Sequence, residues 1–474
     1  MVQEIVESPV LLKGRAEHSV PPRIPRIHSR IGRFKWSSRV AEAARSGPLA
    51  IRNFRLLSLG QSTSTVGDYC YAVALPWLIL SGNGGTVMLG AVLACYGIPR
   101  TLLIPIGGVL ADRLGPRKLM LIADTSRFVL MGLLAVLATR PADALGVIVP
   151  IALLLGACEG MFLPASLSIM PTLLPAGQLP TGNALASATI QIGSLAGPVL
   201  GGLLVAPAGS SPAFAVDAAS FGISAVALAL IRVKPACSAP ADARAQAVAA
   251  AQPEASATAA SAAAASAAAA SAAAEPGPGS WQLLREFSVL RIILAVAVVA
   301  NLTAAGTFDV ALPALAHARY GASGLGGLIA CFGAGSLIGT LAGARMGSLR
   351  RPFAVACRGF VLEAVLLSAL PLLGGLPGAV TAILLAGLCN GFGNIVLYTL
   401  IQQNAPSQSL GRVMSLLTLA AMGTYPISVW LSGLLIKHLN AVAFFPIAGI
   451  TLGLAVLAAL SQREMREFGA ANST

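Results

Sequence analysis

The chain has 474 residues, of which 56% are hydrophobic and only 10% are charged. A soluble globule of this length needs more charged residues to cover its surface, so the composition excludes a soluble protein and indicates an integral membrane protein. The formal net charge is +13, but 11 of the 31 lysines and arginines precede Leu56, and most of the others lie between apolar runs. That distribution is typical of an oriented membrane protein rather than of one that binds nucleic acid.

Two further kinds of site are not indicated. The seven cysteines are scattered singly, without a Cys-x-x-Cys spacing or a neighbouring histidine, so we expect neither disulfides nor a metal site. We find no phosphate-binding loop, which argues against nucleotide hydrolysis as an energy source. We therefore expect a protein that is not an enzyme and that uses no cofactor.

Two segments differ from the rest of the chain in composition. Residues 1–50 are rich in arginine, lysine and proline, and we interpret them as a mostly disordered cytoplasmic tail. Basic residues near anionic lipid gain about 1 kcal/mol each, and the glutamates in this tail argue against an organellar transit peptide. Residues 232–284 are rich in Ala, Ser and Pro, and this low complexity indicates a cytoplasmic linker.

Two sets of six apolar runs flank this linker. Each run is close to the roughly 20 residues that a membrane-spanning helix needs, so we predict an all-α integral membrane protein with twelve transmembrane helices. The N-terminal half, residues 51–231, contains the runs near 56–80, 87–110, 118–138, 146–165, 183–206 and 212–231. The C-terminal half, residues 285–462, contains those near 290–316, 323–345, 353–373, 376–398, 411–436 and 441–462, and a tail follows at residues 463–474.

The lysines and arginines between the spans predict the orientation. Connections that follow even-numbered spans are rich in them, whereas those that follow odd-numbered spans contain only Arg140, Arg319 and Lys437. Because basic loops stay in the cytoplasm, both termini are expected there. The alanine-rich composition fits a bacterial inner membrane, and we expect a monomer in the lipid bilayer.

The two halves also look like diverged copies of one six-helix repeat. Val-Ala-Leu-Pro occurs at residues 73–76, just after Asp68, and again at residues 310–313, just after Asp309. Membrane folds built from two parallel six-helix repeats place the substrate site between the repeats, near the middle of the bilayer. We therefore expect a substrate cavity between the two halves.

Residues 107–120 contain the most specific motif. Its members are Gly108, Asp112, Arg113, Gly115, Arg117 and Lys118. They resemble the signature loop between the second and third helices of the major facilitator superfamily, with Pro116 where the family more often has Arg. The resemblance implies that family's twelve-helix fold. We expect Gly108 and Gly115 to allow a tight turn, and Asp112 to latch the inner gate near residues 409–412, where Arg412 and a helix dipole worth about 0.3 to 1 kcal/mol attract it.

Helix 5 contains a second motif, formed by Gly193, Gly197, Pro198, Gly201 and Gly202. It resembles the antiporter motif of the family's proton-coupled drug exporters, and the resemblance implies export rather than uptake. Glycines four residues apart form a flat helix face, and the same spacing recurs in helix 8 at Gly335, Gly339 and Gly343. We expect the two faces to pack together across the halves, with Gly197 opposite Gly339.

Charged residues inside the spans are functional candidates, because a charge near the bilayer centre costs about 2.5 to 3.5 kcal/mol or more. Asp68 and Glu159 are candidates for proton coupling, and a hydrogen bond between helices is the alternative for Asp68. Helix 4 lacks the arginine of the family's motif, so the usual proton relay is not assigned. We interpret Asp309 as part of a gating or structural pair, and Asp124 and Arg127 as a self-neutralising pair near the inner end of helix 3. Structural or interfacial roles are expected for Arg100, Asp217, Arg358 and Glu363.

Helix 10 contains a polar stripe, in which side chains recur every four residues and share one face. Its members are Asn390, Asn394, Tyr398 and Gln402. Helices 1, 4, 7 and 10 line the cavity in the major facilitator superfamily, so the resemblance implies substrate contact for this stripe. The same role is expected for Tyr69, Phe162, Asn301 and Asp309. Hydrogen bonding between helices is the alternative for the stripe.

Together these features predict a secondary active exporter that moves an amphipathic small molecule outward by proton antiport, with rocker-switch alternation of the two halves. The first helix, with Phe54-Arg55-Leu56-Leu57 and Gly67-Asp68, is similar to that of the branch containing macrolide and siderophore exporters. An importer of a nutrient or lysophospholipid on the same fold is one alternative. A membrane sensor or scaffold without transport activity is another.

Overall fold

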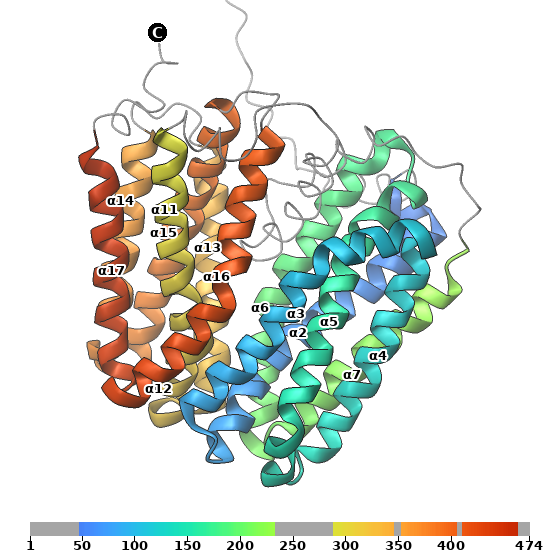
Figure 1. Cartoon of the computed structure of the whole chain (residues 1–474), viewed down its shortest axis with the longest axis horizontal. Helices are drawn as coiled ribbons and strands as arrows, with labels where there is room; N and C mark the ends of the chain where they lie inside the picture. The colour runs from blue at the N-terminus through green and yellow to red at the C-terminus, as the bar shows by residue number, and fades with distance from the viewer. Residues whose placement is uncertain (1–46, 233–287, 346–351, 405–409, 463–474) are drawn as a thin grey trace, which may run out of the picture. The chain divides into compact units, whose positions relative to one another are not determined.

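The structure is a computed structural model that describes residues 47–232, 288–345, 352–404 and 410–462 (Figure 1). These segments are helical apart from short connections, and they contain no strand. The N-terminal basic segment up to residue 46, the alanine-rich linker from residue 233 and the tail from residue 463 lie outside the described residues. The interpretations of those three segments therefore stay predictions.

Six long helices form the N-terminal half, coloured blue to green in Figure 1. They are α2 (Arg52–Ser81), α3 (Gly85–Leu114), α4 (Pro116–Leu137), α5 (Pro141–Leu173), α6 (Leu179–Ala208) and α7 (Ser211–Leu230). Short 3-10 turns precede α2 at Pro48–Ala50 and α6 at Ala176–Gln178. Several of the helices are longer than the predicted spans, because polar residues at their ends continue the helix beyond the apolar run.

The C-terminal half, coloured yellow to red, contains the six remaining spans. The first runs without a break through α11 (Ser288–Ala305), the π-helical turn η3 (Gly306–Ala311) and α12 (Leu312–Arg319). The others are α13 (Gly321–Arg345), α14 (Pro352–Ala369) with the short η4 (Leu370–Leu372), α15 (Leu376–Asn404), α16 (Leu410–Leu439) and α17 (Ala441–Ser461). All twelve predicted spans are thus confirmed as helices.

The described helices are suited to a membrane. Eleven helical segments are long and apolar enough to cross one. The remaining span, α2, has 30 residues but is less apolar, because it contains Asp68 and a polar run at residues 61–65. Large apolar side chains stay exposed on both halves, among them Leu102, Val136 and Leu454. A surface with this much exposed apolar area is suited to lipid rather than to water, so the chain is a multi-pass membrane protein.

The loop predicted between the second and third spans is reduced to one residue. α3 continues to Leu114 and α4 begins at Pro116, so Gly115 alone joins them, with φ 86°. Glycine adopts this conformation without strain, and proline suits the first position of a helix because its missing N–H leaves no donor unpaired there. Pro116 therefore helps to start α4. Gly108 lies inside α3 and makes no turn, so its predicted role in the hinge is wrong.

Arg117 of the same motif joins α4 to the end of α7. Its Nε donates a hydrogen bond to the carbonyl oxygen of Leu228 (2.8 Å), and its Nη2 donates to that of Ala229 (2.7 Å). Carbonyls in the last turn of a helix have no partner within the helix, and a cation there complements the helix dipole. The motif therefore stabilises the N-terminal half as a unit.

Successive helices run in opposite directions, so their connections lie alternately at one end of the helix bundle and at the other. We define the basic end as the end where α2 begins and α17 finishes, since Arg113, Arg117 and Lys118 lie there. The other end is called the opposite end. These two names are used below for positions along the helices.

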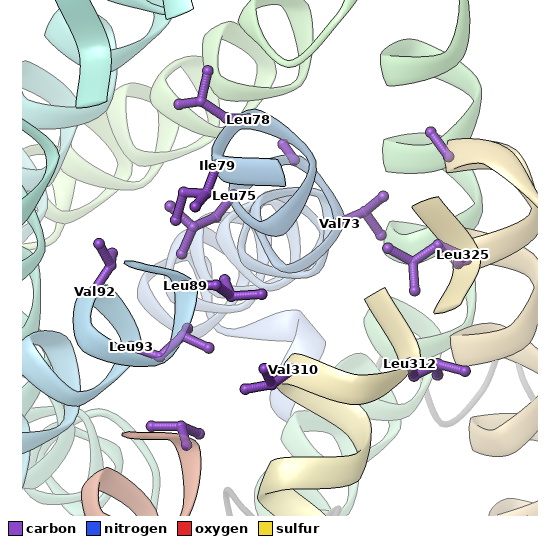
Figure 2. Close-up of a cluster of buried hydrophobic side chains, with 14 of the residues drawn as sticks. Val73, Leu75, Leu78, Ile79, Leu89, Val92, Leu93, Val310, Leu312 and Leu325 are labelled. Carbon is purple, nitrogen blue, oxygen red and sulfur yellow. The ribbon is translucent and has the colours of Figure 1, made fainter. Parts of the chain in front are cut away.

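One hydrophobic core extends across both halves at the opposite end. Figure 2 shows Leu78 of α2 and Leu89 of α3 in the same cluster as Val310 of η3 and Leu325 of α13. Each of these four side chains is at most 2% exposed. Apolar burial of this kind stabilises the contact between the halves.

At the basic end the hydrophobic cores are separate. One cluster contains Met120 and Ile169 and draws its buried members from the N-terminal half alone. Another contains Val413 and Val456 and draws them from the C-terminal half alone. The two halves are thus joined through a common core at one end only, as far as the described clusters show.

Candidate functional site

The contacts between the halves lie toward the opposite end. α6 packs against α13, and α3 packs against α16. Thr86 Oγ1 donates a hydrogen bond to the carbonyl oxygen of Gly433 (3.0 Å). His317 of α12 lies against Trp77, with 4.8 Å between ring centres, and its Nε2 is 3.3 Å from Ser81 Oγ. These residues form a closure between the halves.

The fifth and eighth spans are α6 and α13, and their glycine faces were predicted to pack against each other. In the structure these faces do not meet. Gly193, Gly197 and Gly201 of α6 face α2, whereas Gly335, Gly339 and Gly343 of α13 face α15. The predicted pairing of Gly197 with Gly339 is therefore wrong. Both glycine faces serve packing within a half, because each approaches a neighbouring helix of the same half too closely for a side chain.

The predicted contact between α6 and α13 is nevertheless present, and it uses different glycines. A Cβ atom on Gly202 would lie 2.8 Å from the carbonyl oxygen of Ala322, and one on Gly326 would overlap the carbonyl oxygen of Pro198. Gly201 and Gly202 are adjacent, so they lie about 100° apart around a helix of 3.6 residues per turn. The paired glycines thus let α6 approach α2 on one side and α13 on the other.

Arg127 is the centre of a charged cluster inside the N-terminal half. Its Nη2 donates to Glu159 Oε2 at 2.5 Å, and its Nη1 lies 3.8 Å from Asp124 Oδ1. Arg100 of α3 approaches the other oxygen of Glu159 at 4.0 Å. The side chains of Arg127 and Asp124 are 4% and 0% exposed. At such burial the opposite charges have to compensate one another.

Neighbouring side chains hold this cluster in place. Phe162 and Phe221 lie against the guanidinium group of Arg127, which is 4.6 and 5.3 Å from the two ring centres. Ser224 Oγ donates to Asp124 Oδ2 at 2.6 Å. The predicted Asp124–Arg127 pair is confirmed, but it lies in the middle of α4 rather than near its inner end. Phe162, expected at the substrate, thus contacts the cluster.

Arg127→Met is expected to destabilise the protein strongly. Without the cation, Asp124 and Glu159 lose their shared partner, and loss of one member of a buried ion pair costs about 3 to 5 kcal/mol. The thermal unfolding temperature of the purified protein in detergent measures the effect. Arg140→Met changes an exposed arginine and is the matched control. Equal unfolding temperatures for the two variants would show that the cluster does not stabilise the half.

Asp68 differs from the acids of this cluster, because its side chain is exposed. The residues before and after Asp68 in the sequence face other helices: Gly67 packs against Asp217 of α7, and Tyr69 packs against α6. Asp68 forms no ion pair within 4 Å among the described residues. Glu159 is close enough to interact with it electrostatically. The structure therefore places the carboxyl group of Asp68 beside the charged cluster, in the middle of α2.

Asp309 lies in the π-helical turn η3. Ser428 of α16 bonds to the start of this turn and to the helix before it: its Oγ accepts from the backbone N–H of Gly306 (3.1 Å) and donates to the carbonyl oxygen of Leu302 in α11 (2.5 Å). π-helical turns are frequent at functional sites. Tyr425, also from α16, interacts with the carboxyl group of Asp309. Asp309 thus has a polar partner on the helix that packs against α3 of the other half.

A cavity of about 190 Å³ lies inside the C-terminal half. Its wall consists of side chains from α11, η3, α14, α15, α16 and α17, most of them apolar. The wall includes Asn390, Asn394 and Tyr398 of the polar stripe, together with Asn301. The side chain of Gln402 lies outside the description. Most of the stripe therefore borders a cavity, although this one is within a half rather than between the halves.

Glu363 of α14 also lines this cavity, and the sequence interpretation did not include it in the site. Its side chain is buried, and its Oε1 accepts a hydrogen bond from Asn390 Nδ2 at 2.9 Å. Asn394 Nδ2 in turn donates to Asn390 Oδ1 at 3.0 Å. The signal available in the sequence was a lone acid within an apolar span. Its pairing with a stripe residue on another helix was not predictable.

The contact predicted for Asp112 lies outside the described residues, because residues 405–409 and the side chain of Arg412 are not described. Asp112 and Arg113 are in the last turn of α3, at the basic end. Lys118 is in the first turn of α4. A gating role of this motif stays a prediction.

Comparison with known proteins identifies similar transporters. The family model described as Major Facilitator Superfamily matches residues 57–428. The chain is 31% identical over 197 residues to the multidrug efflux pump Tap of Mycolicibacterium fortuitum, a match that covers 40% of this chain and only 46% of that protein. It is 26% identical over 435 residues to the enterobactin exporter EntS of Salmonella paratyphi A, which covers 88% of this chain and 93% of that one.

Solved structures share the fold. The nucleoside transporter NupG superposes with a TM-score of 0.60 at 14% identity, over 86% of this chain and 98% of that one. A POT family transporter in complex with 5-aminolevulinic acid gives a TM-score of 0.62 at 15% identity, over 86% and 96% of the two chains. Identities this low establish the fold alone. Since the family match extends through both halves and agrees with the twelve-helix architecture, the chain belongs to the Major Facilitator Superfamily.

Proposed function

We propose that this protein exports amphipathic small molecules in exchange for protons, as its two halves alternate between opening to one side of the membrane and to the other. One observation carries the proposal: the halves share a hydrophobic core at the opposite end and have separate cores at the basic end. Alternation requires that each half stay intact when the contact between the halves changes. Separate cores at the basic end meet that requirement.

The basic end is assigned to the cytoplasm, because lysine and arginine are retained on that side. Both termini then lie in the cytoplasm, and a bacterial inner membrane is the proposed location. With this orientation the closure formed by α3, α6, α13 and α16 faces outward. The described conformation is then the one in which an exporter takes up its substrate from the cell.

Asp68 is assigned as the main proton carrier. It is exposed and has no ion pair among the described residues, whereas Glu159 already interacts with Arg127 and Arg100. Protonation of Asp68 therefore breaks no ion pair among the described residues. Because Asp68 and Glu159 interact electrostatically, a change in the charge of Asp68 is felt by the charged cluster. Glu159 is assigned a secondary role in coupling. Similarity to proteins named as exporters, Tap and EntS, supports the outward direction.

Efflux from loaded cells tests the proposal. A bacterial strain without its other exporters, expressing this chain, should lose a preloaded fluorescent amphipathic dye faster than the same strain with an empty vector. Collapse of the proton gradient with a protonophore should remove the difference. Faster dye uptake in place of efflux would indicate an importer. Efflux that persists unchanged with the protonophore would contradict proton coupling, and the absence of any transport across a substrate panel would favour the sensor or scaffold.

A further inference from the structure

Glu363 is a buried acid in the C-terminal half that lacks a cationic partner. Its side chain is 4% exposed, and no lysine, arginine or histidine of the described residues forms an ion pair with it. The buried acid Asp124 of the N-terminal half, by contrast, is paired with Arg127. A buried carboxylate without compensation is unfavourable, because it has lost the stabilisation that water gives to its charge. The charge of Glu363 therefore needs a cation or a proton that the described residues do not supply.

The hydrogen bonds around Glu363 fix one of its two oxygens. Asn394 donates to Asn390, and Asn390 donates to Glu363 Oε1 at 2.9 Å, so this chain of amides holds the carboxyl group from the α15 side. Oε2 has no hydrogen-bond partner among the described residues. A buried acceptor without a donor is unfavourable, because it has lost its hydrogen bonds to water. One acceptor position of the carboxylate is thus available to a donor in the adjoining cavity.

The cavity beside Glu363 suits an organic cation better than an inorganic one. Most of its wall is aliphatic or aromatic, with Phe308, Phe360 and Leu452 as examples, and its volume is about 190 Å³. An apolar cavity of about 150 Å³ binds benzene, so the volume here is enough for a ring with a short chain. A hydrated metal ion would find few polar partners on these walls. The lining residues reach from Ala459 near the basic end to Glu363.

We infer that this cavity binds small lipophilic amines, with Glu363 as the counter-ion of the ammonium group and the apolar wall around the hydrocarbon part. The inference rests on the proposed function only in naming such amines as a substrate class, since binding itself requires no transport. It also gives the two halves different roles. The N-terminal half holds the charged cluster and Asp68, and the C-terminal half recognises the charge of the substrate.

Binding of two matched probes to the purified full-length protein in detergent tests the inference. The probes are 2-phenylethylamine, which is cationic at neutral pH, and 2-phenylethanol, which has nearly the same size and no charge. Isothermal titration should show the amine binding roughly tenfold or more tightly than the alcohol, the scale of a hydrogen bond to a charged group. Glu363→Gln keeps the size of the side chain and removes its charge. It should remove the preference for the amine and leave the affinity for the alcohol unchanged.

Two further variants locate the site and control for charge. Ala300→Phe fills the cavity from α11 and should weaken binding of both probes, which also tests the site should Glu363→Gln fail to fold. Arg358→Met changes an exposed charge on α14, the helix of Glu363, and should bind both probes as the parent does. Unchanged amine affinity in Glu363→Gln, or unchanged binding in Ala300→Phe, would overturn the inference. So would displacement of the amine by sodium ions at constant ionic strength, since the site would then be one for an inorganic cation.

The titration uses no ion gradient, so its outcome is separate from that of the efflux assay. Amine binding that depends on Glu363, without proton-dependent efflux, would contradict the proposed function and uphold the site. Proton-dependent efflux of other compounds by a protein that does not bind the amine would support the proposed function and contradict the amine site.

Discussion

Asp68→Asn is expected to abolish uphill, proton-driven efflux and to leave downhill exchange of substrate in place. The amide has nearly the same size as the carboxyl group but does not titrate. Because Asp68 is exposed and forms no ion pair among the described residues, the change removes no such contact from the fold. Proteoliposomes separate the two activities: accumulation under an imposed pH gradient should fall to background, while counterflow without a gradient should continue.

Glu159→Gln is the comparison variant for this experiment. Its carboxyl group already binds Arg127 and approaches Arg100, so its charge is expected to stay constant through the cycle. We therefore expect a smaller loss of accumulation than in Asp68→Asn. Full accumulation by Asp68→Asn would remove the assignment of Asp68. Loss of accumulation in Glu159→Gln alone would transfer the coupling role to α5.

Gly326→Leu is expected to eliminate transport by preventing the closure at the opposite end. Even a Cβ atom at Gly326 would overlap the carbonyl oxygen of Pro198 on α6, which is backbone and cannot move aside as a side chain can. The two halves would then separate where they share their core. The adjacent Gly327 provides a matched control, because nothing lies within 4 Å of a Cβ atom placed there. Gly327→Leu should transport as the parent does.

The reaction of a cysteine probe measures this closure directly. Leu89 is 0% exposed within the shared core, so Leu89→Cys in a cysteine-free background should react slowly with a water-soluble maleimide. Adding Gly326→Leu should increase the labelling rate several-fold, and adding Gly327→Leu should not. If the two glycine variants label and transport alike, close packing of α6 on α13 is not what seals the opposite end.

The sequence alone was enough to predict the fold, because the signals for it are local. A run of about 20 apolar residues specifies a span whatever surrounds it, and all twelve runs are helices. The i, i+3 spacing of Asp124 and Arg127 placed both on one side of α4, where they pair. The i, i+4 spacing of Asn390 and Asn394 likewise gave a stripe, and both residues border a cavity. Each of these results depends on one helix only.

The tertiary structure alone decided which helices share a contact. Arg127 and Glu159 are 32 residues apart, and Glu363 and Asn390 are 27 apart, so neither pair has a signature in the sequence. The same holds for the glycines, of which Gly197 faces α2 and Gly202 faces α13. In a soluble helix the polar side marks the outside. In a membrane helix the sides that face lipid and protein are both apolar, so hydrophobicity does not fix the rotation of the helix about its axis. Packing against the neighbouring helices sets that rotation, and with it the partners of every buried charge.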